Sequence, residues 1–82
     1  MYHYSRLRDL REDNDLVQKQ IASYLGIDQR VYSNYEIGKR EIPLHLLIQL
    51  ADLYQTSIDY LVGRTDVKDP YSSSLRKIVI KD

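Results

Sequence analysis

Apolar residues recur every three or four positions along most of the chain, a spacing that places them on one face of a helix. Glycine and proline divide this pattern into segments. We predict helices over about 5–13, 18–25, 29–36, 44–55 and 58–62. The chain is therefore expected to be all-α, a bundle of five helices.

Residues at the ends of these segments support the predicted boundaries. Ser5, Asp28 and Ser57 are of the types that accept hydrogen bonds from the free amides at a helix start, and we expect them as N-caps. The fixed φ of Pro43 suits the first turn of the fourth helix. Gly26 tolerates the left-handed conformation that commonly ends a helix.

Each of the first four predicted helices has a face that we expect in the core. These faces are Leu7 and Leu10; Ile21, Ala22 and Leu25; Val31, Tyr32 and Tyr35; and Leu44, Leu47, Ile48, Ala51 and Tyr54. The fourth helix also carries Leu46, Leu50 and Leu53. We place these three on its other faces, where a partner could pack some of them.

Composition limits the class of protein. Eighty-two residues suffice for one domain, and 43% hydrophobic with 29% charged residues is typical of soluble globular chains. The absence of cysteine excludes disulfides and thiolate metal sites. We find no signal peptide and no stretch approaching about 20 apolar residues, so we expect a cytoplasmic protein with no membrane partner.

The end of the chain differs from the rest. Asp69 and Pro70, followed by serines at 72–74, interrupt helices, and the segment 77–81 is rich in β-branched residues. We predict a domain over 1–65 and a tail over 66–82 that is extended or partly disordered.

Enzyme and metal motifs are not found. His3 and His45 lie far apart in the sequence, and neither belongs to a metal-binding or nucleophile motif. Gly38 and Lys39 lack the glycine spacing of a phosphate-binding loop. We expect no enzyme activity, no cofactor and no metal.

Charge is balanced over the whole chain but not locally. Twelve basic and twelve acidic residues give a net charge of zero, which argues against binding polyanions by bulk attraction. Within 16–40, however, four basic residues face two acidic ones. A local basic face is compatible with the balanced total.

The second and third predicted helices are joined by almost no linker. A short connection through Gly26 forces them to cross steeply, and the small Ala22 allows a close approach. This arrangement is a helix-turn-helix. Leu16 to Ile27, Val31 to Arg40, and parts of the later helices resemble the Cro/CI-type (XRE) family of phage and bacterial repressors over about 6–65.

The resemblance implies a lambda-repressor-like DNA-binding domain and assigns residue roles. The base-reading positions of the third helix, the recognition helix, correspond to Gln29, Arg30, Ser33 and Asn34, and the contacts to DNA phosphate correspond to Gln18, Lys19, Lys39 and Arg40. Arg11 and Glu36 match an internal ion pair of the family. We expect that pair to fix the orientation of the recognition helix.

Physical reasoning favours the same surface. A third helix that buries Val31, Tyr32 and Tyr35 exposes four polar residues, three of them uncharged. Such side chains suit hydrogen bonds to base edges, whereas a solvated face more often carries Glu and Lys. The alternative to DNA binding is a five-helix structural domain whose polar face is only solvated.

Two features depart from the family pattern. Members commonly have Ser or Thr at the position of Val17, whose side chain cannot cap a helix, so we expect a frayed first turn. The tail after Thr65 lies outside the resemblance.

These observations predict a sequence-specific regulator of transcription, a repressor that binds a palindromic operator in double-stranded DNA as a homodimer. We expect Ile58, Tyr60 and Leu61 at the dimer interface, with an extension by 78–80. Two alternatives stay open: the antitoxin of a toxin–antitoxin pair, with the toxin as its partner, and a protein-interaction module that does not bind DNA.

Overall fold

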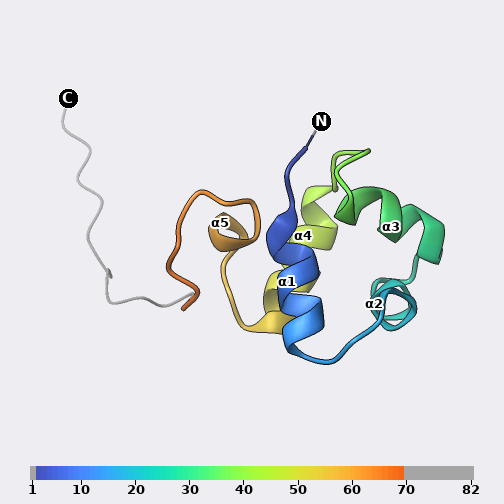
Figure 1. Cartoon of the computed structure of the whole chain (residues 1–82), viewed down its shortest axis with the longest axis horizontal. Coiled ribbons are helices and arrows are strands. Elements are labelled where there is room, and N and C mark those ends of the chain that lie inside the picture. The colour runs from blue at the N-terminus through green and yellow to red at the C-terminus, as the bar shows by residue number, and fades with distance from the viewer. Residues whose placement is uncertain (1, 70–82) are drawn as a thin grey trace.

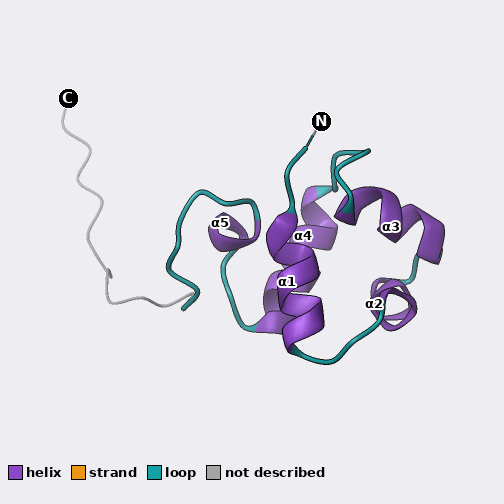
Figure 2. Ribbon diagram, viewed as in Figure 1, coloured by secondary structure: helices purple, strands orange, loops and turns teal. Residues whose placement is uncertain are grey.

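The computed structural model describes residues 2–69 and contains five helices there, with no strand in that range. The helices are α1 (Ser5–Asp13), α2 (Gln18–Leu25), α3 (Gln29–Glu36), α4 (Leu44–Tyr54) and α5 (Ile58–Leu61) (Figure 2). The all-α prediction is confirmed, and α2 and α3 have the predicted bounds.

The helices form one bundle around a shared core. Figure 1 shows α1 and α4 in the middle, α2 and α3 together on one side, and α5 on the other. The packing partners are α2 with α3, α4 with α5, and α1 with both α3 and α5. Tyr32, Leu7, Leu10, Ile21, Leu50 and Leu61 are the largest completely buried side chains.

The buried face of α4 differs from the prediction. Leu46 and Leu50 lie in the core, whereas Leu44 and Ile48 are 63% and 46% exposed. An apolar run this dense is compatible with several helical faces, and packing against α5 and the rest of the core selects one of them. Leu46 and Leu50 therefore need no partner molecule to cover them.

Four helix ends also differ from the prediction, and one of them is the end of α5, which lies at Leu61 instead of residue 62. Tyr4, not Ser5, is the N-cap of α1, because Tyr4 already provides the first carbonyl of the helix to the Leu7 amide. Pro43 is the N-cap of α4 rather than a first-turn residue. The helix then stops at Tyr54, because Gln55 adopts a left-handed conformation with φ of 52°.

The described part of the predicted tail, 66–69, contacts the helical domain. Arg6 of α1 donates hydrogen bonds to the carbonyls of Tyr60 and Thr65 and pairs with Asp66 at 2.6 Å. Thr56 Oγ1 donates to the Lys68 carbonyl at 2.6 Å. The β-branched segment 77–81, which includes the predicted 78–80 extension of the interface, lies outside the described residues.

Within the described range, no helix is both long and apolar enough to cross a lipid bilayer.

Candidate nucleic-acid interface

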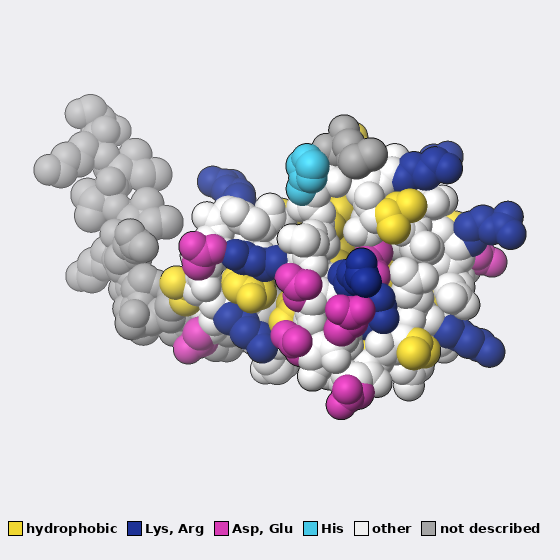
Figure 3. All heavy atoms as spheres, viewed as in Figure 1, with side chains coloured by type: hydrophobic (Ala, Val, Ile, Leu, Met, Phe, Trp, Pro, Cys, Tyr) yellow, Lys and Arg dark blue, Asp and Glu magenta, His cyan; other side chains and the backbone are white. Residues whose placement is uncertain are grey.

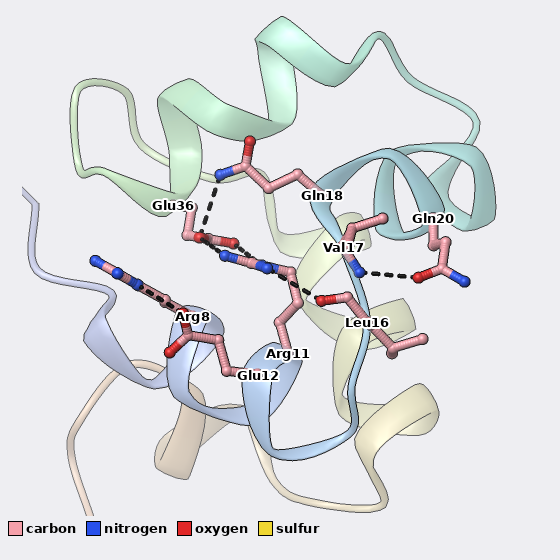
Figure 4. A network of polar contacts seen from close by, with 8 residues as sticks. All are labelled: Arg8, Arg11, Glu12, Leu16, Val17, Gln18, Gln20 and Glu36. Carbon is pink, nitrogen blue, oxygen red and sulfur yellow. Dashed lines mark hydrogen bonds and ion pairs between the residues drawn. The ribbon is translucent and has the colours of Figure 1, made fainter.

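The first turn of α2 is closed by a side chain. Gln20 Oε1 accepts a hydrogen bond from the Val17 amide at 2.8 Å (Figure 4). This interaction supplies one half of a capping box, in which the third residue of the helix bonds back to the N-cap amide. Gln20 thus holds the Val17 amide, whereas the Val17 side chain makes no cap hydrogen bond to the helix amides, so the expectation of a frayed first turn stays a prediction.

The turn between α2 and α3 brings the two helices close together. Gly26 has a φ of 73°, and the amide of Ile27 donates to the carbonyl of Ala22 at 3.0 Å. Ala22 is 3% exposed. Figure 1 shows α2 nearly end-on while α3 lies in the plane of the view, so the helices cross steeply.

The start of α3 has a side-chain cap. Asp28 Oδ1 accepts from the Arg30 amide at 2.7 Å, as expected for an aspartate N-cap. Tyr32 anchors the inner side of the helix and is completely buried. Val31, predicted in the core, is instead 38% exposed, and Tyr35 is half-buried, because α3 lies at the edge of the bundle.

The four predicted base-reading residues share the outer side of α3. Gln29 and Arg30 are exposed, and Ser33 and Asn34 are half-buried. An open depression of about 400 Å³ beside them is lined by Gln18, Asp28, Gln29, Arg30 and Ser33. Side chains from the starts of α2 and α3 thus border one surface.

The loop after α3 carries two exposed cations, Lys39 and Arg40. Their amides both donate to the Asn34 carbonyl, at 2.9 and 3.2 Å, so this part of the loop is fixed to α3. In Figure 3, separate Lys and Arg side chains project along the edge of the molecule formed by α2, α3 and this loop, and others lie over α1 and α5. Lys19 is exposed on α2.

Arg11 and Glu36 form the ion pair expected from the resemblance. Arg11 Nε donates to Glu36 Oε2 at 2.9 Å, and the second contact joins Arg11 Nη2 to Glu36 Oε1 at 2.8 Å. Arg11 Nη1 also donates to the Leu16 carbonyl at 3.1 Å (Figure 4). The pair links α1 to the end of α3 and to the segment that leads into α2.

A contact from Gln18 to Glu36 could not be read from the sequence. Gln18 Nε2 donates to Glu36 Oε1 at 3.2 Å, which connects the start of α2 to the same carboxylate (Figure 4). Burial alone would raise the pKa of Glu36, but the hydrogen bonds from Arg11 and Gln18 outweigh it and lower the pKa below its ordinary value. The carboxylate is therefore held in its charged form.

Two neighbouring tyrosines have the opposite shift. Burial, together with the negative charge of Glu36, raises the pKa of Tyr32 far above its ordinary value and that of Tyr54 to about 12. Both phenols remain neutral over the physiological range. The charge of the buried network is thus confined to Arg11 and Glu36.

The expected dimer residues are not equally accessible. Leu61 is 1% exposed and belongs to the core of this chain, so it offers no surface to a partner. Its inclusion in the predicted interface is wrong, because the apolar face of α5 points inward. Ile58 and Tyr60 are half-buried, and the guanidinium of Arg6 lies 4.0 Å from the Tyr60 ring centroid.

Neither the histidines nor the carboxylates of the described residues form a metal site. His3 and His45 are both exposed. Among the described residues, no group of three or more His, Cys, Asp or Glu side chains is arranged to hold a metal ion.

Comparison with known proteins identifies the architecture. A helix-turn-helix family model matches residues 7–61, the segment that contains the α2–α3 pair and most of the core. The chain belongs to the helix-turn-helix family of Cro/CI type. The resemblance inferred from the sequence is thereby confirmed.

Individual relatives agree with this assignment. The chain is 43% identical over 65 residues to the uncharacterized HTH-type transcriptional regulator YobD of Bacillus subtilis, covering 79% of this chain and 58% of that protein. It is 33% identical to the cryptic phage CTXphi transcriptional repressor RstR of Vibrio cholerae, covering 90% and 68%.

A solved structure has the same fold. The crystal structure of a transcriptional regulator from Listeria innocua superposes with a TM-score of 0.71 at 32% sequence identity, covering 77% of this chain and 61% of that one. This helix-turn-helix chain thus spans about three-fifths of the length of YobD and of the Listeria regulator.

Proposed function

We propose that this helix-turn-helix protein binds double-stranded DNA sequence-specifically and represses transcription at a palindromic operator. One observation carries the proposal: the outer side of α3 presents polar side chains beside the start of α2, with two cations fixed to the same helix through the Asn34 carbonyl. A helix with such a face fits the major groove, where base pairs present distinct donors and acceptors.

Base reading is assigned to the outer side of α3. Arg30 is suited to guanine, and Gln29 and Asn34 are suited to adenine, because these side chains can form paired hydrogen bonds with those bases. Ser33 is short and bonds to either kind of base edge at close approach. Gln29, Arg30 and Ser33 line one open depression on this side, and Asn34 lines another with Arg30.

Phosphate binding is assigned to the two flanks of α3. Lys39 and Arg40 lie on one flank and are exposed cations. On the other, Gln18 and Lys19 occupy the first turn of α2, whose free amides and partial positive charge attract anions. Contacts on both flanks would fix the register of α3 in the groove without reading sequence.

The active form in this proposal is a homodimer in the cytoplasm. Ile58 and Tyr60 on α5 supply part of the interface, and two-fold symmetry sets the two recognition helices about 34 Å apart. YobD is named as a transcriptional regulator and RstR as a transcriptional repressor, which supports repression as the outcome.

Selection of binding sites from random duplex DNA tests the proposal. The selected duplex should bind far more tightly than its shuffled version. Log K should fall against log salt with a slope of roughly −4 to −5, as expected for about four to six neutralised phosphates per dimer. Equal affinity for every duplex, or a flat salt response, would contradict DNA binding as the function.

Stoichiometry tests the dimer. Sedimentation of the complex should give two chains per palindromic duplex, and one chain per duplex would refute the dimer. Copurification of a second small protein that releases the operator would favour the antitoxin alternative, and a folded protein that binds no duplex would favour the protein-interaction module.

A further inference from the structure

The segment before α1 runs beside the loop between α3 and α4, at the top of Figure 1. Tyr2 and Tyr4 stack with parallel rings whose centroids are 6.0 Å apart. Tyr4 is 9% exposed and Tyr2 is 43% exposed, so the inner ring is seated in the core and the outer ring covers it. We call residues 2–4 the N-terminal arm. Beyond α1, its hydrogen bonds go to Gly38 and Ile42 and not to the four predicted base-reading residues of α3.

The arm holds both ends of the loop that carries the two cations. The amide of Tyr2 donates to the Gly38 carbonyl at 3.1 Å, directly before Lys39. Beyond the cations, the buried amide of Ile42 donates to the hydroxyl of Tyr4 at 3.3 Å. The 38–42 loop is therefore attached to the arm at its two ends and to α3 in its middle.

We propose that Tyr4 is a positioning residue for DNA phosphate binding, which acts by holding the 38–42 loop so that Lys39 and Arg40 meet the backbone beside α3. The inference rests on the proposed function. No base contact is assigned to Tyr4, because its hydroxyl is directed to the Ile42 amide inside the molecule.

The physical reason is the cost of ordering a loop. Exposed Lys and Arg side chains lose rotamer freedom when they bind phosphate, and a loose backbone adds its own loss. Hydrogen bonds at both ends of the loop remove the backbone part of that cost before DNA arrives. Releasing one end should weaken phosphate contacts without changing which bases α3 prefers.

Tyr4→Phe tests the inference, because it deletes the hydroxyl and keeps the stacked ring. The variant should bind the selected duplex and random duplex more weakly by the same factor, about three- to tenfold, the value of one hydrogen bond. The amide of Ile42 should exchange with solvent faster by a similar factor. Unchanged affinity for both duplexes would overturn the inference.

A double-mutant cycle separates positioning from a general loss of stability. In a background with both Lys39→Ala and Arg40→Ala, Tyr4→Phe should weaken binding no further, because the loop has no cations left to position. A full additional loss in that background would show that Tyr4 acts elsewhere, and would also overturn the inference.

Tyr54→Phe is the matched control. It removes a buried hydroxyl that has no hydrogen-bond partner in the described structure, and it should leave DNA affinity unchanged. If the wild-type protein prefers no duplex, the proposed function fails. If the wild-type protein binds its selected duplex and Tyr4→Phe binds equally well, only the role of Tyr4 fails.

Discussion

On its inner side α3 carries Tyr32 and Glu36, both buried, whereas on its outer side it carries four polar residues that reach solvent. The inner side chains have shifted pKa values and contacts to other helices. The outer ones line open depressions. One helix eight residues long thus separates the interactions that fix its orientation from those that we assign to recognition.

This separation has a consequence for mutations. The inner network joins α1, α2 and α3 through a single carboxylate, so damage to it changes the folding free energy of the whole bundle. The outer side chains make few contacts within the chain, and their loss should leave folding nearly unchanged. Four changes, taken from the largest expected effect to the smallest, test the comparison.

Removal of the Glu36 carboxylate should have the largest effect. Glu36→Ala leaves the Arg11 guanidinium, 13% exposed, without its partner, and the free energy of unfolding should fall by about 3 kcal/mol or more. Chemical denaturation measures the loss. At a temperature where the variant is folded, its preferred DNA site should be unchanged.

Glu12→Ala is the control for that change. Glu12 pairs with Arg8 at 3.3 Å on the surface, where both side chains are more than half exposed, and an exposed helical pair contributes about 0.5 kcal/mol or less. Equal losses for the two substitutions would contradict a special role for the buried pair.

Truncation of a base-reading side chain should have the opposite result: DNA affinity falls and the free energy of unfolding does not. Arg30→Ala should cost about 1 to 3 kcal/mol of binding free energy per half-site on the selected duplex and little on random DNA. Unfolding should be unaffected, because Arg30 is exposed. Titration of both duplexes measures the difference, with the exposed Arg8→Ala on α1 as the control.

How far the sequence alone predicts this molecule depends on the range of each interaction. The bounds of α2 and α3 could be predicted because Gly26 and Asp28 are local signals that act on adjacent backbone. The buried face of α4 could not, because an almost continuous apolar run does not indicate which side meets the core.

Candidate site residues follow the same rule. The Arg11–Glu36 pair was accessible through the family resemblance, but the contact from Gln18 to Glu36 depends on how steeply α2 crosses α3. The bond from Ile42 to Tyr4 joins positions 38 residues apart, and neither residue type indicates it. The base-reading and phosphate roles stay predictions until DNA binding is measured.

Acid should lower the free energy of unfolding by protonating the Glu36 carboxylate on the inner side of α3. Because the folded-state pKa of Glu36 lies below the ordinary value of 4.5, its carboxylate contributes stability that is present above that value and is lost as pH falls toward the folded-state pKa. Glu36→Gln should therefore be less stable than wild type at neutral pH and lose less stability on acidification. Parallel curves for the two proteins between about pH 6 and pH 3 would contradict this.

The smallest expected effect is a gain at the start of α2. Val17 occupies the N-cap, and only the Gln20 half of the capping box is present, because a valine side chain cannot accept from the helix amides. Val17→Thr should complete the box and raise the free energy of unfolding by about 0.5 to 1 kcal/mol, which corresponds to about 2 to 8 °C in Tm for a domain of this size.

The matched control is Val67→Thr, since Val67 is a similarly exposed valine outside any helix and should give no gain. A stabilisation that survives the further change Gln20→Ala would assign the gain to the threonine cap itself, whereas no gain in either background would show that the first turn of α2 is already as stable as a side-chain cap can make it.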